Sequence, residues 1–237
     1  MSGMHGDPEA TIRVMPGLAT VHRQLHLLLV VDCSGSMTGD KMASLNYAIR
    51  TAIPAIRDVA ADNPEVEVRL RVLRFSTEAT WHEFGPTPPE AFVWRDLTAG
   101  GETAMGAALA EVAKVLTPQA MPGRHLPPVV ILVSDGQPSD DFEQGLAAML
   151  AAPYGARALR VAVSIGMDAD RDVLQAFIGD ANFRPLQANN AQDLVQRITW
   201  ATTAAIKSVS AATTDPSPLS TLGRQAPSRS IDGDLVW

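Results

Sequence analysis

Apolar segments of strand length alternate with longer segments of helical period along most of the chain. Strands are expected at 25–32, 66–75, 127–136 and 158–166, and helices at 40–60, 103–116, 140–151, 170–179 and 191–208. This alternation is typical of a mostly parallel sheet with helices on both faces. The pattern therefore predicts an α/β, Rossmann-like, doubly wound fold.

Shorter features refine this prediction. The segment 66–75, "VEVRLRVLRF", alternates apolar and charged residues, as a strand near a sheet edge does. The segment 79–84, "ATWHEF", predicts a short antiparallel partner at that edge, and another short strand is expected at 183–186. Pro54 should kink or divide the helix that contains it.

One domain accounts for most of the chain. We expect an N-terminal extension at 1–21, the domain at 22–208, and a tail at 209–237 that is rich in Pro, Ser and Thr. From about Thr213 the tail has almost nothing to bury. The final "IDGDLVW" becomes apolar again, so it should dock on the body or on a partner, or else remain disordered.

Composition and charge exclude several classes of partner. The chain is 46% hydrophobic and 19% charged, an ordinary soluble composition, and its net charge of −7 argues against binding to nucleic acid or an anionic membrane. A single cysteine, Cys33, cannot form an internal disulfide. No apolar segment reaches the length of a membrane span. We therefore expect a cytoplasmic protein.

Hard oxygen ligands follow the carboxyl ends of predicted strands, where open parallel sheets bind their ligands. These are Asp32, Ser34 and Ser36 after the first strand, Thr103 in "AGGETAMG", and Asp135 in "LVSDGQP". Residues at two-residue steps can point the same way. Alone, "DCSGS" is more typical of a helix cap than of a metal site. Together, the three clusters predict a site for Mg²⁺ or Mn²⁺.

In order and spacing, "DCSGSM", the glycine-preceded Thr103 and "SDGQP" resemble the von Willebrand factor A domain with its metal-ion-dependent adhesion site. The resemblance covers about residues 22–207 and implies a Rossmann-like central sheet with one antiparallel edge strand. It also implies that Ser34, Ser36 and Thr103 bind the ion through hydroxyls, while Asp32 and Asp135 act directly or through water. A Glu or Asp of a protein partner would complete the site, so binding rather than catalysis is expected.

Within this family, "LLLVVDCSGSM", "SDGQPSDD" and "ADRDVLQAF" are most similar to bacterial tellurite-resistance proteins of the TerY type. That resemblance implies stress or conflict systems with a Ser/Thr kinase and a PP2C-type phosphatase as partners. Glu102 directly precedes Thr103, a departure from the family's usual Thr-Gly-Gly-Thr, and we expect it to face solvent. Asp232 and Asp234 leave open an occupation of the site in cis by the tail.

Other possible sites and functions can be weighed from specific residues. Asp168, Asp170 and Asp172 alternate as in a calcium loop, but Val173 and Gly179 stand where an EF-hand needs Gly and Glu. The acids are better explained by a helix N-terminus. Two rivals stay open: an adaptor of a MoxR or chelatase-type AAA+ ATPase, and a metal-dependent phosphohydrolase. The sequence contains no nucleophile elbow or dinucleotide fingerprint.

Overall fold

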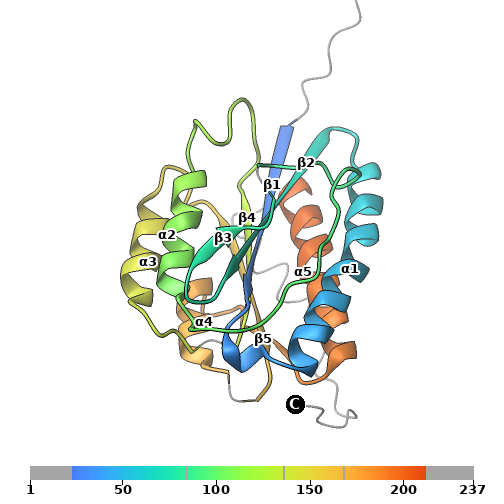
Figure 1. Cartoon of the computed structure of the whole chain (residues 1–237). Helices are drawn as coiled ribbons and strands as arrows, with labels where there is room; N and C mark the ends of the chain where they lie inside the picture. The colour runs from blue at the N-terminus through green and yellow to red at the C-terminus, as the bar shows by residue number, and fades with distance from the viewer. Residues whose placement is uncertain (1–22, 84, 136, 168, 212–237) are drawn as a thin grey trace, which may run out of the picture.

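The computed structural model describes residues 23–83, 85–135, 137–167 and 169–211 (Figure 1). They form a six-stranded sheet with the order β3-β2-β1-β4-β5-β6. The strands are β1 (Arg23–Asp32), β2 (Val66–Phe75), β3 (Ala79–Trp81), β4 (Val129–Ser134), β5 (Leu159–Ile165) and β6 (Leu186–Ala188). The predicted α/β fold with a mostly parallel sheet is confirmed.

Strand pairing places β1 at the centre of the sheet. β1 is parallel to β2 on one side and to β4 on the other, whereas β3 is antiparallel to β2 at the edge, as predicted. The strand expected at 183–186 is instead Leu186–Ala188. Phe183 is buried because its ring stacks on Trp200, with 6.3 Å between the centroids, so its apolar signal reflects helix packing rather than a strand.

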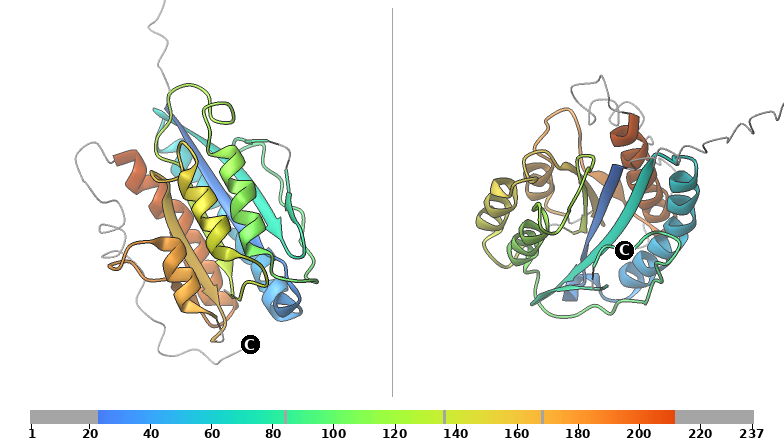
Figure 2. Two further views of the ribbon diagram at one scale, coloured as in Figure 1. Left: turned by 90° about the vertical axis from the view of Figure 1, so that its left-hand side faces the viewer. Right: turned by 90° about the horizontal axis from the view of Figure 1, so that it is seen from above.

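Helices cover both faces of the sheet (Figure 2). They are the short 3₁₀ helix η1 (Gly35–Met37) and the α-helices α1 (Asp40–Ala61), α2 (Met105–Val115), α3 (Phe142–Ala151), α4 (Arg171–Ile178) and α5 (Ala191–Ala211). α1 packs against α5 on one face, and α2 packs against α3 on the other, where α4 also lies. None of the described helices combines the length and apolar character that a membrane span needs.

Pro54 lies inside α1, which is one uninterrupted helix. Of the two predicted effects of this proline, a kink or a division of the helix, the division is therefore wrong. Proline removes one backbone donor, but Pro54 is exposed, and the surrounding turns bury Ile49, Ile53 and Ile56 against the core. Burial of this apolar face holds the helix together across the missing hydrogen bond.

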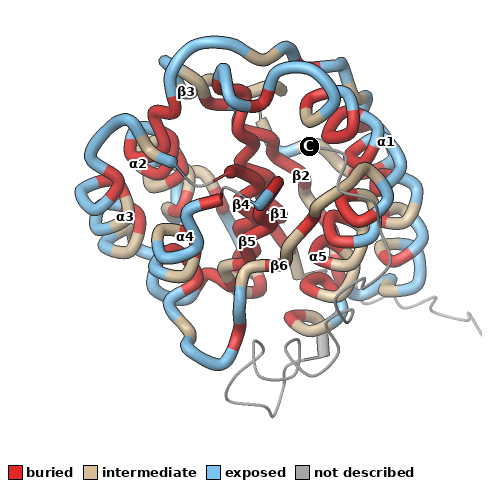
Figure 3. Tube along the Cα trace, turned by 90° about the horizontal axis from the view of Figure 1, so that it is seen from below, coloured by how far each residue is buried: buried red, intermediate tan, exposed pale blue. Residues whose placement is uncertain are grey.

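The central strands are buried on both faces, as the view from below shows (Figure 3). All six residues of β4 are buried, and so is β1 from Leu25 to Asp32. The chain leaves β1 toward the α1 face and leaves β4 toward the α3 face. Because these two neighbours diverge at their carboxyl ends, a ligand crevice is expected between them.

Candidate metal centre

Asp32 ends β1 as a fully buried carboxylate. Its Oδ1 accepts a hydrogen bond from the Ser34 backbone N–H at 2.8 Å, and its Oδ2 accepts one from the Ser134 hydroxyl at 2.5 Å. Burial raises the pKa of Asp32, and the negative charge of Asp135 adds to that rise, while the two serines oppose it. The carboxylate is therefore held in a fixed position where its charge favours a nearby cation.

Ser34 and Ser36 place two hydroxyls side by side after Asp32. Their Oγ atoms are 2.9 Å apart, with Ser34 buried and Ser36 exposed. Between them, Gly35 donates its N–H to the Gly101 carbonyl at 2.9 Å, and a Cβ at Gly35 would lie 3.3 Å from that oxygen. Glycine is thus favoured here by the close approach of another loop.

Thr103 lies in a loop that is hydrogen-bonded to two other loops, the one after β1 and the one after β4. Gly100 donates to the Cys33 carbonyl at 2.8 Å, which joins this loop to the end of β1. The Thr103 N–H donates to Ser139 Oγ at 3.0 Å, and Ser139 returns its N–H to the Thr103 carbonyl at 2.9 Å. Thr103 is buried, with 8% of its surface exposed.

Asp135 follows β4 and completes the group. Its side chain is 4% exposed, and its Oδ2 lies 3.9 Å from the Lys41 Nζ. Its buried Oδ1 has no hydrogen-bond partner among the described residues. A buried carboxylate oxygen without a donor is costly unless a cation compensates it, so this atom fits a metal-binding role.

The loops that carry the five predicted residues thus meet at the carboxyl ends of β1 and β4. Asp32, Ser34, Ser36, Thr103 and Asp135 offer two carboxylates and three hydroxyls, the ligand chemistry of Mg²⁺ and Mn²⁺. Carboxylates alone do not build the site: within the described part of the chain, no group of three or more His, Cys, Asp or Glu could hold a metal ion. Whether these five residues bind an ion stays a prediction.

Three residues that were not predicted from the sequence also shape this site: Lys41, Ser134 and Ser139. Ser134 follows Val133, which pairs with Val31, so the register of β1 and β4 brings Ser134 opposite Asp32. Ser139 fixes the Thr103 loop. Of these three, only Ser134 could have been suspected from the sequence, because it directly precedes Asp135, a predicted ligand. Its contact with Asp32 could be predicted only if β1 and β4 were known to be neighbours.

Neighbouring residues agree with their predicted structural roles. Glu102 is exposed. Cys33 is part of the buried core, and burial raises the pKa of its thiol to about 12, which favours the protonated thiol. Asp170 caps α4 by accepting from the backbone N–H groups of Asp172 and Val173 at 3.1 and 3.2 Å. Asp168 lies outside the described residues, as do Asp232 and Asp234 of the tail.

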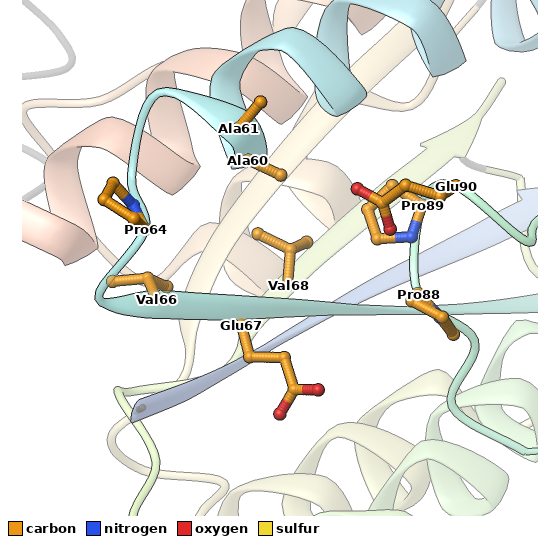
Figure 4. Close-up of a pocket in the computed structure, with 9 residues that line it drawn as sticks. All are labelled: Ala60, Ala61, Pro64, Val66, Glu67, Val68, Pro88, Pro89 and Glu90. Atoms are coloured by element: carbon orange, nitrogen blue, oxygen red, sulfur yellow. The ribbon is translucent and has the colours of Figure 1, made fainter. Parts of the chain in front are cut away.

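A separate hollow lies at the opposite edge of the sheet, where α1 ends and β2 begins (Figure 4). It is lined by Ala60, Ala61, Pro64, Val66, Glu67, Val68, Pro88, Pro89 and Glu90. This lining has two carboxylates but no hydroxyl group. The group of carboxylates and hydroxyls at the carboxyl ends of β1 and β4 is therefore the stronger candidate for a metal.

A family model described as the von Willebrand factor type A domain matches residues 26–197. The chain belongs to the von Willebrand factor A family. The match runs from His26 in β1 to Arg197 in the second turn of α5 and includes all five predicted ligands. A search of curated proteins found no significant match.

Solved structures share this von Willebrand factor A fold at low sequence identity. A von Willebrand factor type A protein from Catenulispora acidiphila is 17% identical with a TM-score of 0.60, covering 78% of this chain and 43% of that one. The pilus adhesin SpaC from Lactobacillus rhamnosus GG is 14% identical, with a TM-score of 0.61 and coverage of 79% and 31%. Proximal thread matrix protein 1 from the mussel byssus, with a zinc-occupied MIDAS motif, is 19% identical, with a TM-score of 0.56 and coverage of 79% and 46%. The chain therefore spans less than half the length of these three proteins.

Proposed function

We propose that this von Willebrand factor A domain is a metal-dependent protein-binding module. Asp32, Ser34, Ser36, Thr103 and Asp135 would hold Mg²⁺ or Mn²⁺ at the carboxyl edge of the sheet. The observation that carries the proposal is the buried Asp135 Oδ1, which has no hydrogen-bond partner among the described residues although hydroxyls and a second carboxylate converge nearby. The zinc-occupied MIDAS motif of the mussel protein supports a divalent metal at such a site.

The chain's own residues favour capture of an acidic partner. Two carboxylates balance a divalent charge, so a bound ion would supply an electrophilic position for a further carboxylate. Ser134 and the Ser34 N–H hold Asp32, and the Ser139 pair holds the Thr103 loop, so the ligands need little rearrangement. The partner would present a Glu or Asp side chain.

A binding role without catalysis is also part of the proposal. Buried His26 lies near the start of β1, and His125 bridges to Gln24 beside it, so both imidazoles are at the opposite edge from the serines. A serine nucleophile would need a base within hydrogen-bond reach. This argues against a serine hydrolase, whereas a metal-dependent phosphohydrolase can use a metal-bound water and is therefore an outcome of the test below.

The biological setting rests on the resemblance to TerY-type proteins. We propose a cytoplasmic role in bacterial tellurite or stress resistance, with a Ser/Thr kinase and a PP2C-type phosphatase as partners. An adaptor of a MoxR or chelatase-type ATPase uses the same site for a different partner. Capture from a bacterial cytoplasm, followed by identification of the bound proteins, separates these two settings.

The metal dependence is tested with Asp135→Ala against Asp58→Ala, which removes an exposed acid from α1. Mn²⁺ at about 100 times its Kd should stabilise the wild type by about 2.7 kcal/mol through binding to the folded chain alone. Thermal unfolding should show this rise for the wild type and Asp58→Ala, and no rise for Asp135→Ala. Partner capture should disappear in EDTA.

Two results would count against the proposal. Partner capture that survives both EDTA and Asp135→Ala would remove the metal from the mechanism. Metal-dependent release of phosphate that Asp32→Ala abolishes would instead support the phosphohydrolase.

A further inference from the structure

Lys41 is a cationic side chain at the edge of the candidate metal centre. It lies in the first turn of α1, and its Nζ is 3.9 Å from Asp135 Oδ2. The two side chains are 16% and 4% exposed. In the other four ion pairs of the described residues, every side chain is at least 25% exposed, so Lys41 and Asp135 form the most buried pair.

The position of Lys41 is electrostatically unfavourable apart from this contact. A cation in the first turn of a helix meets the positive end of the helix dipole. Gly39, the N-cap residue, contributes no side-chain hydrogen bond there. Asp40, in the same turn, is exposed, so the buried Asp135 is the acid within ion-pair distance that compensates the ammonium.

The Lys41–Asp135 contact compensates the charge of the carboxylate but does not supply it with a direct hydrogen bond. At 3.9 Å, the Nζ and Oδ2 atoms are farther apart than in a direct hydrogen bond. Asp135 Oδ1 has no hydrogen-bond partner among the described residues. The ammonium therefore neutralises Asp135 and leaves this oxygen available to an ion.

We propose that Lys41 is a built-in competitor of the divalent cation. In the metal-free chain its ammonium is the counter-ion of Asp135. When an ion binds, two positive charges share this carboxylate in a poorly screened crevice and repel each other. Lys41 therefore weakens metal binding and sets the concentration at which the site fills. This inference rests on the metal site of the proposed function.

The competition predicts opposite changes in two measurements. Lys41→Met keeps the apolar stem and removes the charge. Metal-free Lys41→Met should unfold at a lower temperature, because Asp135 loses its counter-charge. The same variant should bind Mn²⁺ at least about tenfold more tightly, because the repulsion is gone. A residue that only contributes to packing would not change the two quantities in opposite directions.

Two further variants serve as controls. Lys41→Arg keeps the charge, so its Mn²⁺ affinity should remain within about threefold of the wild type. Lys114→Met makes the same charge change at an exposed lysine that pairs with Glu111 on α2, and it should alter neither measurement. The full chain is titrated with MnCl₂ by calorimetry, and thermal unfolding is recorded in EDTA. Lys41→Gln provides the same comparison should Lys41→Met not fold.

The outcomes distinguish this inference from the metal site itself. Unchanged or weaker Mn²⁺ binding by Lys41→Met, with a wild type that binds and an Asp135→Ala variant that does not, overturns the role of Lys41 alone. Binding by Lys41→Met but not by the wild type supports the competition and overturns metal dependence of the natural chain. Absence of binding in both overturns both proposals.

Discussion

Asp32 shows a conflict between stability and function at the scale of one residue. Its carboxylate is fully buried, and burial raises its pKa, so ionised Asp32 is unfavourable in the metal-free fold. The hydrogen bonds from Ser134 and the Ser34 N–H favour the ionised carboxylate and partly offset the effect of burial. The negative charge of Asp135 disfavours the ionised form further. If stability alone determined the residues at the ends of β1 and β4, two buried acids, Asp32 and Asp135, would not lie close together there. We infer that Asp32 is present for ligand binding.

Asp32→Asn should raise the unfolding temperature of the metal-free chain by a few degrees at neutral pH. The amide can accept from the Ser34 N–H and donate to Ser134 Oγ, so the contacts are retained while the buried charge is removed. The same variant should lose the stabilisation by Mn²⁺. Thermal unfolding with and without Mn²⁺ measures both effects.

Asp58→Asn, at an exposed position of α1, is the matched control and should change neither quantity. If metal-free Asp32→Asn were less stable than the wild type, the ionised carboxylate would be contributing to the fold, contrary to this account.

At the scale of secondary-structure elements, the packing of α2 against α3 determines the position of Thr103. A Cβ at Gly106 would stand 2.2 Å from the Asp141 carbonyl oxygen, and one at Gly145 would stand 2.2 Å from the Gly106 carbonyl oxygen. The Asp140 carboxylate accepts from the N–H groups of Gly106 and Ala107, both at 2.8 Å. These contacts fix the start of α2 directly after Thr103.

Gly106→Ala should destabilise the protein by about 1–3 kcal/mol, although alanine favours helices, because backbone atoms occupy the space of the new methyl group. The displaced helix start should also weaken Mn²⁺ binding. Chemical denaturation and calorimetry measure the two effects.

Ala107→Ser adds one heavy atom at the adjacent exposed position and should change stability by less than about 0.5 kcal/mol. A Gly106→Ala variant as stable as the wild type would show that α2 and α3 can separate at no cost.

At the scale of the whole molecule, we expect the response to acid to depend in part on His26, a histidine in the central strand β1. His26 is 1% exposed, and neither ring nitrogen has a hydrogen-bond partner among the described residues. Burial, together with the positive charges of Arg71, His125 and Arg69, lowers its pKa from 6.5 to about 4. His26 is therefore neutral in the folded chain over a range where the unfolded chain takes up a proton.

Stability should fall as the pH drops from about 6.5 to about 4, because only the unfolded state is protonated there. The shift corresponds to about 3 kcal/mol in total. His26→Leu should be at least as stable as the wild type at pH 7 and should lose less stability by pH 4.5. Urea unfolding at both pH values measures the difference.

His82→Gln, at a half-buried position, should retain most of the acid sensitivity. Equal loss of stability in the wild type and His26→Leu would assign the acid response to other groups.

Sequence periodicity by itself determined the architecture. The buried runs of β1 and β4 and the helical periods between strands required a covered, mostly parallel sheet, and "ATWHEF" predicted its antiparallel edge. Four of the predicted site residues, Asp32, Ser34, Ser36 and Asp135, lie at or just after the ends of β1 and β4, whereas Thr103 lies just before α2. The periodicity of apolar residues indicates which side chains are buried. That pattern was clear enough along this chain to predict its main helices and strands.

The tertiary structure alone decided how these residues meet. The register of β1 and β4 places Ser134 on Asp32, the approach of α1 places Lys41 beside Asp135, and the loop contacts join Thr103 to Ser139. The helical period predicted a helix on both sides of Pro54, but only the structure shows that α1 is undivided there and that Phe183 belongs to helix packing. Such contacts join residues far apart in the chain, and their geometry depends on sheet order and helix packing, which local patterns do not encode.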